Sequence, residues 1–308
     1  MQTLRPVRTS VFLIFGALAL RASATAQIAP CAEQARIAQT AGVLEAQADL
    51  QKALAIHQNI LDPQERHDAL VESFGEYLDE LALVDEQYEG RLAVCSRLGG
   101  GVYAPDIDPQ DFVAVIDNPF MPLLPGARRS YRKVEPNGVV ETIEIEVLTE
   151  TREILGVACT VVRDIAMENG VVIEETLDYY AQDTDGNVWY FGELAMNFED
   201  GYLHDLDGSW IGGEDGAQPG ILMQATPQVG TVYRQEFFLG EAEDTAGIVA
   251  LGVQAQVPYG TFGGCLVTHD FSPVDPGLLE QKYYAPGIGV VLEINLVDGA
   301  RLELMSVQ

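Results

Sequence analysis

The residues with the clearest chemical potential lie between positions 183 and 220, where acidic and aromatic side chains are concentrated. Asp183, Asp185 and Asn187 stand at alternate positions of one short loop. Oxygen ligands at the first, third and fifth positions of a loop begin many calcium sites. Asp205 and Asp207 follow in a second loop, and hard oxygen ligands suit calcium better than zinc. These five residues are therefore the candidate ligands of a calcium ion.

A simpler interpretation competes with the calcium site. Asp-Gly and Gly-Asn pairs are typical turn residues of β-hairpins. The loop also departs from an EF-hand, because Gly186 falls at its fourth position and Leu194 at its twelfth, where a Glu is needed. The sequence favours ordinary turns with solvated acids, leaves calcium as the alternative, and indicates no other cofactor.

The aromatic residues of the same region could face a ligand. Both tryptophans of the chain, Trp189 and Trp210, lie here, and Glu193 ends the first aromatic strand. Aromatic faces beside carboxylates can bind sugars, and a pair of carboxylates can hydrolyse a glycosidic bond. Strict alternation along a strand would place Trp189 and Glu193 on one face and Tyr190 on the other. Trp189, Glu193 and Trp210 are therefore the ligand-facing candidates.

The sequence assigns no catalytic residue. It contains no G-x-S-x-G elbow, no H-E-x-x-H helix, no phosphate-binding glycine loop and no C-x-x-C pair. A protein without enzymatic activity is therefore favoured over an enzyme. The alternative is a carboxylate-dependent hydrolase, acting for example on carbohydrate through this acidic and aromatic region.

The chain is strongly acidic, with 47 Asp and Glu against 17 Lys and Arg and a net charge of −30. Such a surface repels nucleic acid, which requires clustered cations. Three explanations of the acid excess remain open: a solvated surface, such as that of a protein from a saline habitat, cation binding in particular loops, and a basic partner. One basic cluster, at residues 128–133, could hold an acidic ligand, but it is better explained by the acid-rich strand at 141–150.

The first 26 residues have the pattern of a secretory signal peptide. Arg5 and Arg8 precede an apolar run at 11–20, and small residues follow at 22–26. The apolar run is too short to span a bilayer. We expect cleavage after Ala26, with cleavage after Ala24 as the alternative. We also expect no membrane anchor afterwards, and a secreted or periplasmic protein.

Residues 27–98 are expected to form an antiparallel helical hairpin. Asp62, Pro63 and Glu65 have the types and spacing that start a helix. Apolar residues recur near the helical period on both sides of this break. The first stripe comprises Ile37, Ala41, Leu44, Ala48 and Ala55, and the second comprises Leu70, Phe74, Tyr77, Leu81, Val84, Tyr88 and Cys95.

The positions of Cys31 and Cys95 predict a disulfide that closes this hairpin. Cys31 precedes residue 62 by 31 positions and Cys95 follows it by 33. Because both helices rise equally per residue, the two cysteines meet at the open end.

A linker at 99–109, rich in Gly, Pro and Asp, leads to residues 110–308, where runs of alternating apolar and polar residues predict antiparallel strands. The fold class is therefore α+β. Three landmarks recur in order, at 125–132 and 229–234, at 159–164 and 265–270, and at 179–181 and 283–285. They predict two β-repeats, at about 118–198 and 221–298, that form a sandwich or a partly closed barrel.

The repeat places Cys159 and Cys265 at equivalent positions. Exported proteins that contain one disulfide seldom keep free thiols. We therefore expect Cys159 and Cys265 to form a second disulfide, with two buried thiols as the alternative.

The β-region resembles a group of uncharacterised secreted bacterial proteins. The resemblance covers roughly residues 110–300 and is carried by short stretches, N-P-x-x-P-L-x-P-G at 118–126, Y-A-Q-D-x-x-G-N-V-W-Y-F-G-E at 180–193, S-W-x-x-G-x-x-G-A-x-P-G-I at 209–221, G-E-A-E-D at 240–244 and K-Y-Y-A-P-G-x-G at 282–289. It implies no activity. The expected function is an exported, non-catalytic binding or interaction module for a small ligand or a protein, with calcium in loops 183–215 as an open possibility.

Overall fold

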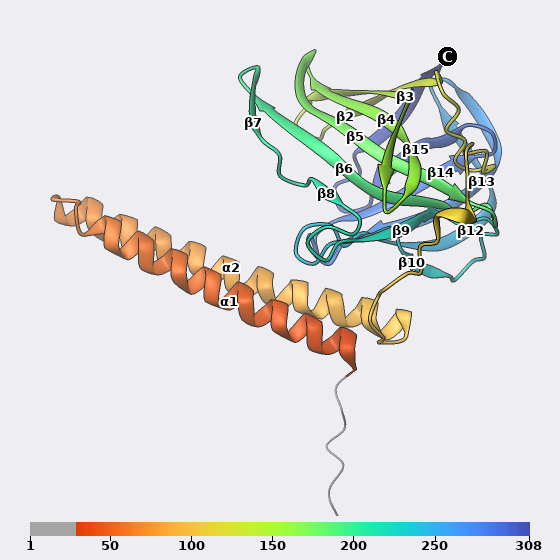
Figure 1. Cartoon of the computed structure of the whole chain (residues 1–308). Helices are drawn as coiled ribbons and strands as arrows, with labels where there is room; N and C mark the ends of the chain where they lie inside the picture. Colours follow the sequence, from red (N-terminus) through yellow and green to blue (C-terminus); the bar gives the residue numbers. More distant parts are fainter. Residues whose placement is uncertain (1–28) are drawn as a thin grey trace, which may run out of the picture.

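The computed structural model describes residues 29–308, so the expected signal peptide at 1–26 lies outside the described residues. Two helices form an N-terminal hairpin, and sixteen antiparallel strands form one sheet that curls into a nearly closed barrel (Figure 1). The predicted α+β class is confirmed. Of the two expected β-architectures, a sandwich and a partly closed barrel, the structure has the barrel. Among residues 29–308, no helix combines the length and the apolar character needed to cross a membrane.

Helix α1 (Pro30–His57) and helix α2 (Pro63–Leu98) are separated at the predicted break. The side chain of Asp62 accepts hydrogen bonds from the backbone N–H groups of Gln64 and Glu65, at 2.8 and 2.9 Å. These bonds satisfy donors that the first turn of a helix leaves without partners. Cys31 and Cys95 form a disulfide, with their Cα atoms 5.7 Å apart. The helix start and the disulfide are both confirmed.

The face through which α1 packs differs from the prediction. Ile37 and Leu44 are 55 % and 60 % exposed, and the three alanines of the predicted stripe are exposed as well. The buried residues of α1 are Ala35 and Ala46. At Gly42, an added Cβ would lie 2.8 Å from a methyl carbon of Val84 in α2. The helices therefore approach closely through small residues, while Ile37, Leu44 and Ile56 of α1 are exposed to solvent.

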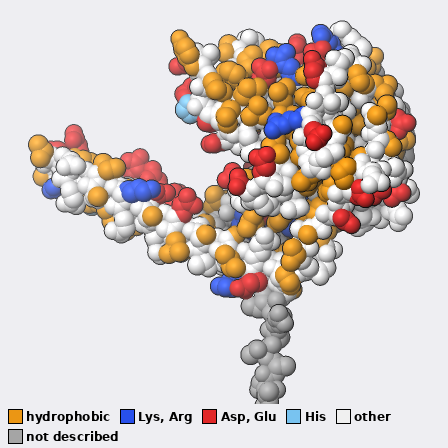
Figure 2. Space-filling model, viewed as in Figure 1, with side chains coloured by type: hydrophobic (Ala, Val, Ile, Leu, Met, Phe, Trp, Pro, Cys, Tyr) orange, Lys and Arg blue, Asp and Glu red, His pale blue; other side chains and the backbone are white. Residues whose placement is uncertain are grey.

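The hairpin forms an arm that meets the barrel near the disulfide and projects beyond it (Figure 1, Figure 2). Arg91 of α2 makes a buried ion pair with Glu243 of the barrel, at 2.7 Å between Nη2 and Oε1. The side-chain amide of Gln87 donates to the carbonyl of Val274 at 2.8 Å. Farther along the arm, Phe74 is 49 % exposed, although it belongs to the predicted packing stripe.

Residues 99–108 connect the arm to the one-turn helix η1 (Pro109–Asp111) and to the first strand. The strands are β1 (Phe112–Val113), β2 (Arg128–Val134), β3 (Val140–Ile154), β4 (Val157–Glu168), β5 (Val171–Asp183), β6 (Val188–Glu199), β7 (Tyr202–Asp205), β8 (Trp210–Ile211), β9 (Gln218–Met223), β10 (Val232–Arg234), β11 (Glu236–Phe237), β12 (Thr245–Val257), β13 (Gly260–Phe271), β14 (Leu279–Ala285), β15 (Gly289–Asn295) and β16 (Arg301–Val307). Around the barrel the long strands follow the order β12-β13-β14-β15-β16-β2-β3-β4-β5-β6-β9.

One short segment joins the two edges of this sheet. β10 pairs with β12 at one edge, and β11 pairs with β9 at the other. Only Gln235 separates β10 from β11. The segment therefore bridges the two edges, so that the barrel is nearly closed and part of each edge is paired.

Strands β4-β5-β6 and β13-β14-β15 have the same pairing scheme. Tyr180 lies opposite Thr160, and Tyr284 lies opposite Leu266 one position after the second equivalent cysteine. In the pairing of β5 with β6, the register shifts after Tyr179. In the pairing of β14 with β15, it shifts after Tyr283. These equivalences agree with the predicted repeat, while duplication of the sequence stays a prediction.

The expected disulfide between Cys159 and Cys265 is wrong. Both are buried free thiols, in β4 and β13 respectively. Strands β14, β15, β16, β2 and β3 lie between those two strands in the sheet. The thiols also belong to separate apolar clusters, whereas a disulfide requires Cα atoms within about 7 Å. Equivalence in a repeat therefore did not bring the two cysteines together.

Candidate functional site

The loop at 183–187 is a hairpin turn held by Asp183. Its carboxylate accepts hydrogen bonds from the backbone N–H and the side-chain amide of Asn187, each at 2.8 Å. It also accepts one from the indole Nε1 of Trp189 at 2.8 Å. Asp185 is exposed at the tip of the turn. The alternating oxygens of this loop therefore fix the turn, as the simpler interpretation expected.

Asp205 and Asp207 lie at the opposite end of β6. Asp205 pairs with Asn197 near the end of that strand, whereas Asp183 precedes its beginning. The hydrogen bond from Asn197 lowers the pKa of Asp205. The five candidate ligands therefore do not form one calcium site, and within residues 29–308 no group of three or more His, Cys, Asp or Glu side chains is arranged to hold a metal ion.

The two tryptophans are structural rather than ligand-facing. Trp189 packs edge-on against Phe112 on the outer side of the sheet, in the cluster that contains Phe191. Trp210 is 3 % exposed and packs edge-on against Tyr190. Both predictions that these indoles face a ligand are therefore corrected: each ring is used to pack β6 against neighbouring segments.

Glu193 faces the interior of the barrel because β6 contains a β-bulge. Tyr179 lies opposite Gly192, but Tyr180 lies opposite Tyr190, so Phe191 is an extra residue. An extra residue reverses the alternation of the side chains that follow it. Glu193 therefore lies on the same face as Tyr190, and the face predicted for it from strict alternation is wrong.

Three carboxylates meet on this interior face and are called the acid cluster: Asp164 of β4, Asp178 of β5 and Glu193 of β6. Asp178 lies directly opposite Glu193 in the sheet and accepts a hydrogen bond from the Tyr190 hydroxyl at 2.6 Å. Burial raises the pKa of Asp178 to about 7. Burial, and then the charge of Asp178, raise the pKa values of Asp164 and Glu193 to about 8. The acid cluster therefore binds protons far more readily than exposed carboxylates do.

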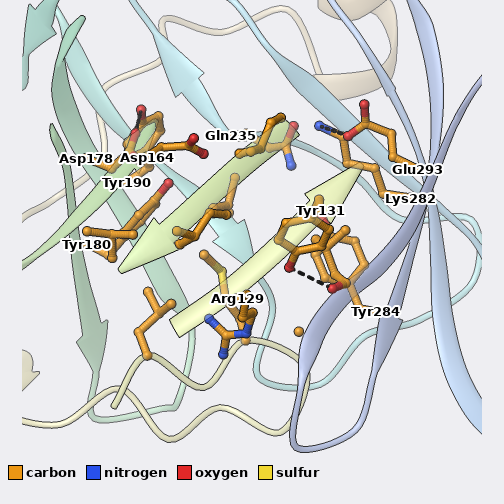
Figure 3. A pocket seen from close by; sticks show the side chains of 18 of the residues that line it. Arg129, Tyr131, Asp164, Asp178, Tyr180, Tyr190, Gln235, Lys282, Tyr284 and Glu293 are labelled. Atoms are coloured by element: carbon orange, nitrogen blue, oxygen red, sulfur yellow. Dashed lines mark hydrogen bonds and ion pairs between the residues drawn. The ribbon is translucent and has the colours of Figure 1, made fainter. Parts of the chain in front are cut away.

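The acid cluster lines a cavity of about 450 Å³ inside the barrel (Figure 3). Tyr180 and Tyr190 stack beside it with ring centroids 4.8 Å apart. Two further acids, Glu236 and Asp244, extend the acidic wall at the segment that closes the sheet. The apolar part of the lining comprises Met121, Pro122, Leu123, Ile143, Ile145, Val162, Leu222, Val290 and Leu302.

The opposite wall of the cavity holds a lysine among acids (Figure 3). The ammonium of Lys282 lies 3.1 Å from Glu280, 3.4 Å from Asp270 and 3.6 Å from Glu293. Burial alone would lower the pKa of Lys282, but these three carboxylates raise it well above its ordinary value. On this side of the cavity, the buried carboxylates are therefore compensated by a cation of the protein itself, the Lys282 ammonium.

The basic cluster at 128–133 divides between the surface and the cavity. Arg128 pairs with Glu146, and Lys133 pairs with Glu135 and Glu141, as expected for cations that balance an acid-rich strand. Arg129 instead lines the cavity and donates to the carbonyl of Pro122 at 2.7 Å. It thereby holds the loop of residues 118–126 against the barrel interior.

Sequence reasoning found Glu193 but missed most of this site. The missed residues are Arg129 as a cavity residue, Asp164, Asp178, Tyr180, Glu236, Asp244, Lys282 and Glu293. One signal was present: Asp178 and Lys282 each precede the repeated Tyr-Tyr-Ala landmark by the same spacing. The two equivalent positions carry opposite charges, an aspartate in the first half and a lysine in the second.

No protein-family profile and no curated protein matches the chain. A solved structure from Bacteroides fragilis, described as an exported protein with a YmcC-like fold, is similar at 14 % identity and a TM-score of 0.36. A lipoprotein structure from Parabacteroides distasonis is similar at 11 % identity and a TM-score of 0.34. Each match covers 61 % of this chain and 98 % of the other. At these scores the function must be argued from the cavity itself.

Proposed function

We propose that this protein is an exported, non-catalytic binding protein that holds a small ligand inside its barrel. The observation that carries the proposal is the cavity of about 450 Å³ with an apolar floor, two stacked tyrosines and a few buried charges. Ligand sites in proteins are commonly cavities of about 300–1,000 Å³ with this mixture of apolar lining and a small number of polar groups.

The stretches that carry the sequence resemblance also support a site at this position. Pro122 comes from the first, Tyr180 and Glu193 from the second, Asp244 from the fourth and Lys282 from the fifth, and all of these line the cavity. They are separated in the chain by many strands, so a ligand site gives a common reason for their positions.

A cavity-filling variant tests the proposal. Ile145 lines the cavity, and Ile145→Trp should occupy part of the volume. Val171→Trp, at an exposed position of β5, is the matched control. Compounds from a small-metabolite library that raise the melting temperature of the wild type should also raise that of V171W but not that of I145W. A library without effect on the wild type, or with equal effects on all three proteins, would contradict the proposal.

A carboxylate-dependent hydrolase is the second candidate, and one observation favours it. Asp178 and Glu193 lie directly opposite each other beside the cavity, with pKa values of about 7 and 8. Paired carboxyl groups with raised pKa values are typical of acid–base catalysis. Hydrolysis of a panel of nitrophenyl glycosides that is abolished by both D178N and E193Q would establish the hydrolase, whereas hydrolysis unaffected by these changes would exclude this role for the pair.

A further inference from the structure

The two halves of the barrel carry opposite charges at one pair of equivalent positions, Asp178 and Lys282. Asp178 lies opposite Val162 and Glu193, while Lys282 lies opposite Thr268 and Glu293. Each residue stands one position before the tyrosine, Tyr179 or Tyr283, after which the register shifts. Asp178 therefore has in β5 the place that Lys282 has in β14.

Two of the three acids around Lys282 have counterparts in the first half, whereas the third, Glu280, corresponds to Thr176 of β5. Asp164 of β4 corresponds in register to Asp270 of β13, and Glu193 of β6 corresponds to Glu293 of β15. In the second half, Asp270 and Glu293 lie on either side of the Lys282 ammonium, at 3.4 and 3.6 Å. The first half therefore has acids at both corresponding positions, Asp164 and Glu193. At the position of the Lys282 cation it has a third acid, Asp178.

The acid cluster has no internal cation among the described residues. The charges that act on Asp164, Asp178 and Glu193 are those of neighbouring acids, and all of them are repulsive toward a carboxylate. Like charges buried together are costly unless a cation or protons compensate them. A positively charged ligand would remove this cost.

Two aromatic side chains complete the surroundings. The stacked rings of Tyr180 and Tyr190 flank the acid cluster, and aromatic faces attract cations. The two tyrosine rings and the acid cluster therefore line the same part of the cavity (Figure 3).

We propose that the acid cluster binds the ammonium group of an amine whose apolar body occupies the rest of the cavity, so that the ligand takes the place that the Lys282 side chain has in the second half. The inference rests on the proposed binding function and names its ligand class. A metal ion is the less suitable cation, because no group of three or more His, Cys, Asp or Glu side chains in residues 29–308 has the arrangement that a metal ion needs. An ammonium group needs only two or three acceptors, as Lys282 itself illustrates.

Three probes of similar shape but different charge distinguish the effect of the ammonium charge from that of the apolar body. They are 2-phenylethylammonium, 2-phenylethanol and 3-phenylpropionate, measured by calorimetry with the wild-type protein at pH 8. The ammonium probe should bind at least tenfold more tightly than the alcohol, and the carboxylate should bind most weakly. If all three bind equally, a cavity ligand site remains but the amine inference fails. If none binds, the inference fails, and the metabolite screen with I145W decides the binding function separately.

Two variants locate the effect. Asp178→Asn removes one charge and should reduce ammonium binding at least tenfold while leaving binding of the alcohol unchanged. Asp178→Lys supplies an internal ammonium like that of Lys282 and should abolish selectivity for the ammonium probe. Exposed Asp185→Asn is the control, because its side chain lies outside the cavity, and it should bind as the wild type does. Ammonium binding that survives unchanged in D178N would overturn the inference.

Discussion

Arg91 of α2 and Glu243 of the barrel, 152 positions apart, form an ion pair from which water is almost excluded. The exposed fractions of the two side chains are 7 % and 0 %. The carboxylate of Glu243 also accepts a hydrogen bond from the backbone N–H of Gly240 at 2.9 Å. This ion pair therefore fastens the arm to the barrel. Loss of either partner would leave the other charge buried and unpaired, which would lower the stability of the protein.

Arg91→Met should release the arm. Removal of one partner leaves a buried charge without compensation, which costs about 3–5 kcal/mol in comparable pairs. We expect a lower midpoint in urea unfolding and faster hydrogen exchange in α2, and the double variant R91M/E243L should recover most of the loss. Arg36→Met, in an exposed pair with Glu33, is the control and should change the midpoint little. Equal effects of R91M and R36M would contradict the role given to the buried pair.

Two glycines of the hairpin test how closely its helices pack. Gly75 has no atom within 4 Å of an added Cβ, so Gly75→Ala should stabilise the protein by about 0.5–1 kcal/mol through its better helix propensity. Gly42 would bring its Cβ to 2.8 Å from a methyl group of Val84. Gly42→Ala should therefore forfeit that gain and lower the melting temperature relative to G75A. The small-residue packing of α1 would be contradicted by equal gains at both positions.

Local signals were sufficient to predict the arm. The Asp62-Pro63 helix start and the nearly equal spacing of Cys31 and Cys95 from it depend only on neighbouring residues and on helical rise. The packing face was not predictable from apolar period alone, since α1 has a large apolar stripe and a small-residue stripe. Contact with α2 selected the latter, because Gly42 permits the closest approach.

The cavity could be predicted only in part, because its residues depend on long-range pairing. Glu193 was identified as a candidate, but the bulge at Phe191 decides which way it points, and that bulge exists only in the pairing of β6 with β5. Glu236 is brought to the cavity by the closure of the sheet between β10 and β11. Neither event leaves a periodic pattern in the sequence.

The acid cluster makes stability depend on pH in a defined direction. Asp178 has a folded pKa of about 7, and Asp164 and Glu193 have values of about 8, against about 4 in an unfolded chain. Between these limits the native state holds protons that the unfolded state releases, so the stabilisation is complete below about pH 4 and is lost as the pH rises to 8.

Urea unfolding measured from pH 5 to pH 8 should therefore show a decreasing free energy of unfolding. Asp178→Asn removes one of the three titrating groups and relieves the other two, so its stability should fall less steeply over the same interval. A wild-type stability that rises from pH 5 to pH 8, or an identical slope in D178N, would contradict the assignment of these groups.

The bulge that directs Glu193 into the cavity depends on Gly192. Its φ angle is +136°, and an added Cβ would lie 2.3 Å from the carbonyl oxygen of Trp210, which is too close for any side chain. Gly192→Ala should therefore displace β8 or remove the bulge, and either change moves Glu193. We expect a loss of several kcal/mol, beyond the roughly 1–2 kcal/mol that a positive φ costs an ordinary residue.

Gly170→Ala separates strain from steric conflict. Gly170 also has a positive φ angle, +83°, but nothing lies within 4 Å of its added Cβ. The G170A variant should lose less stability than G192A and should still bind 2-phenylethylammonium. The G192A variant should lose more stability and should no longer bind the ammonium probe. Stability losses of equal size, with ammonium binding intact in G192A, would mean that the bulge does not position Glu193. The second half of the barrel contains the same feature, because Val291 is the extra residue of a corresponding bulge two positions before Glu293.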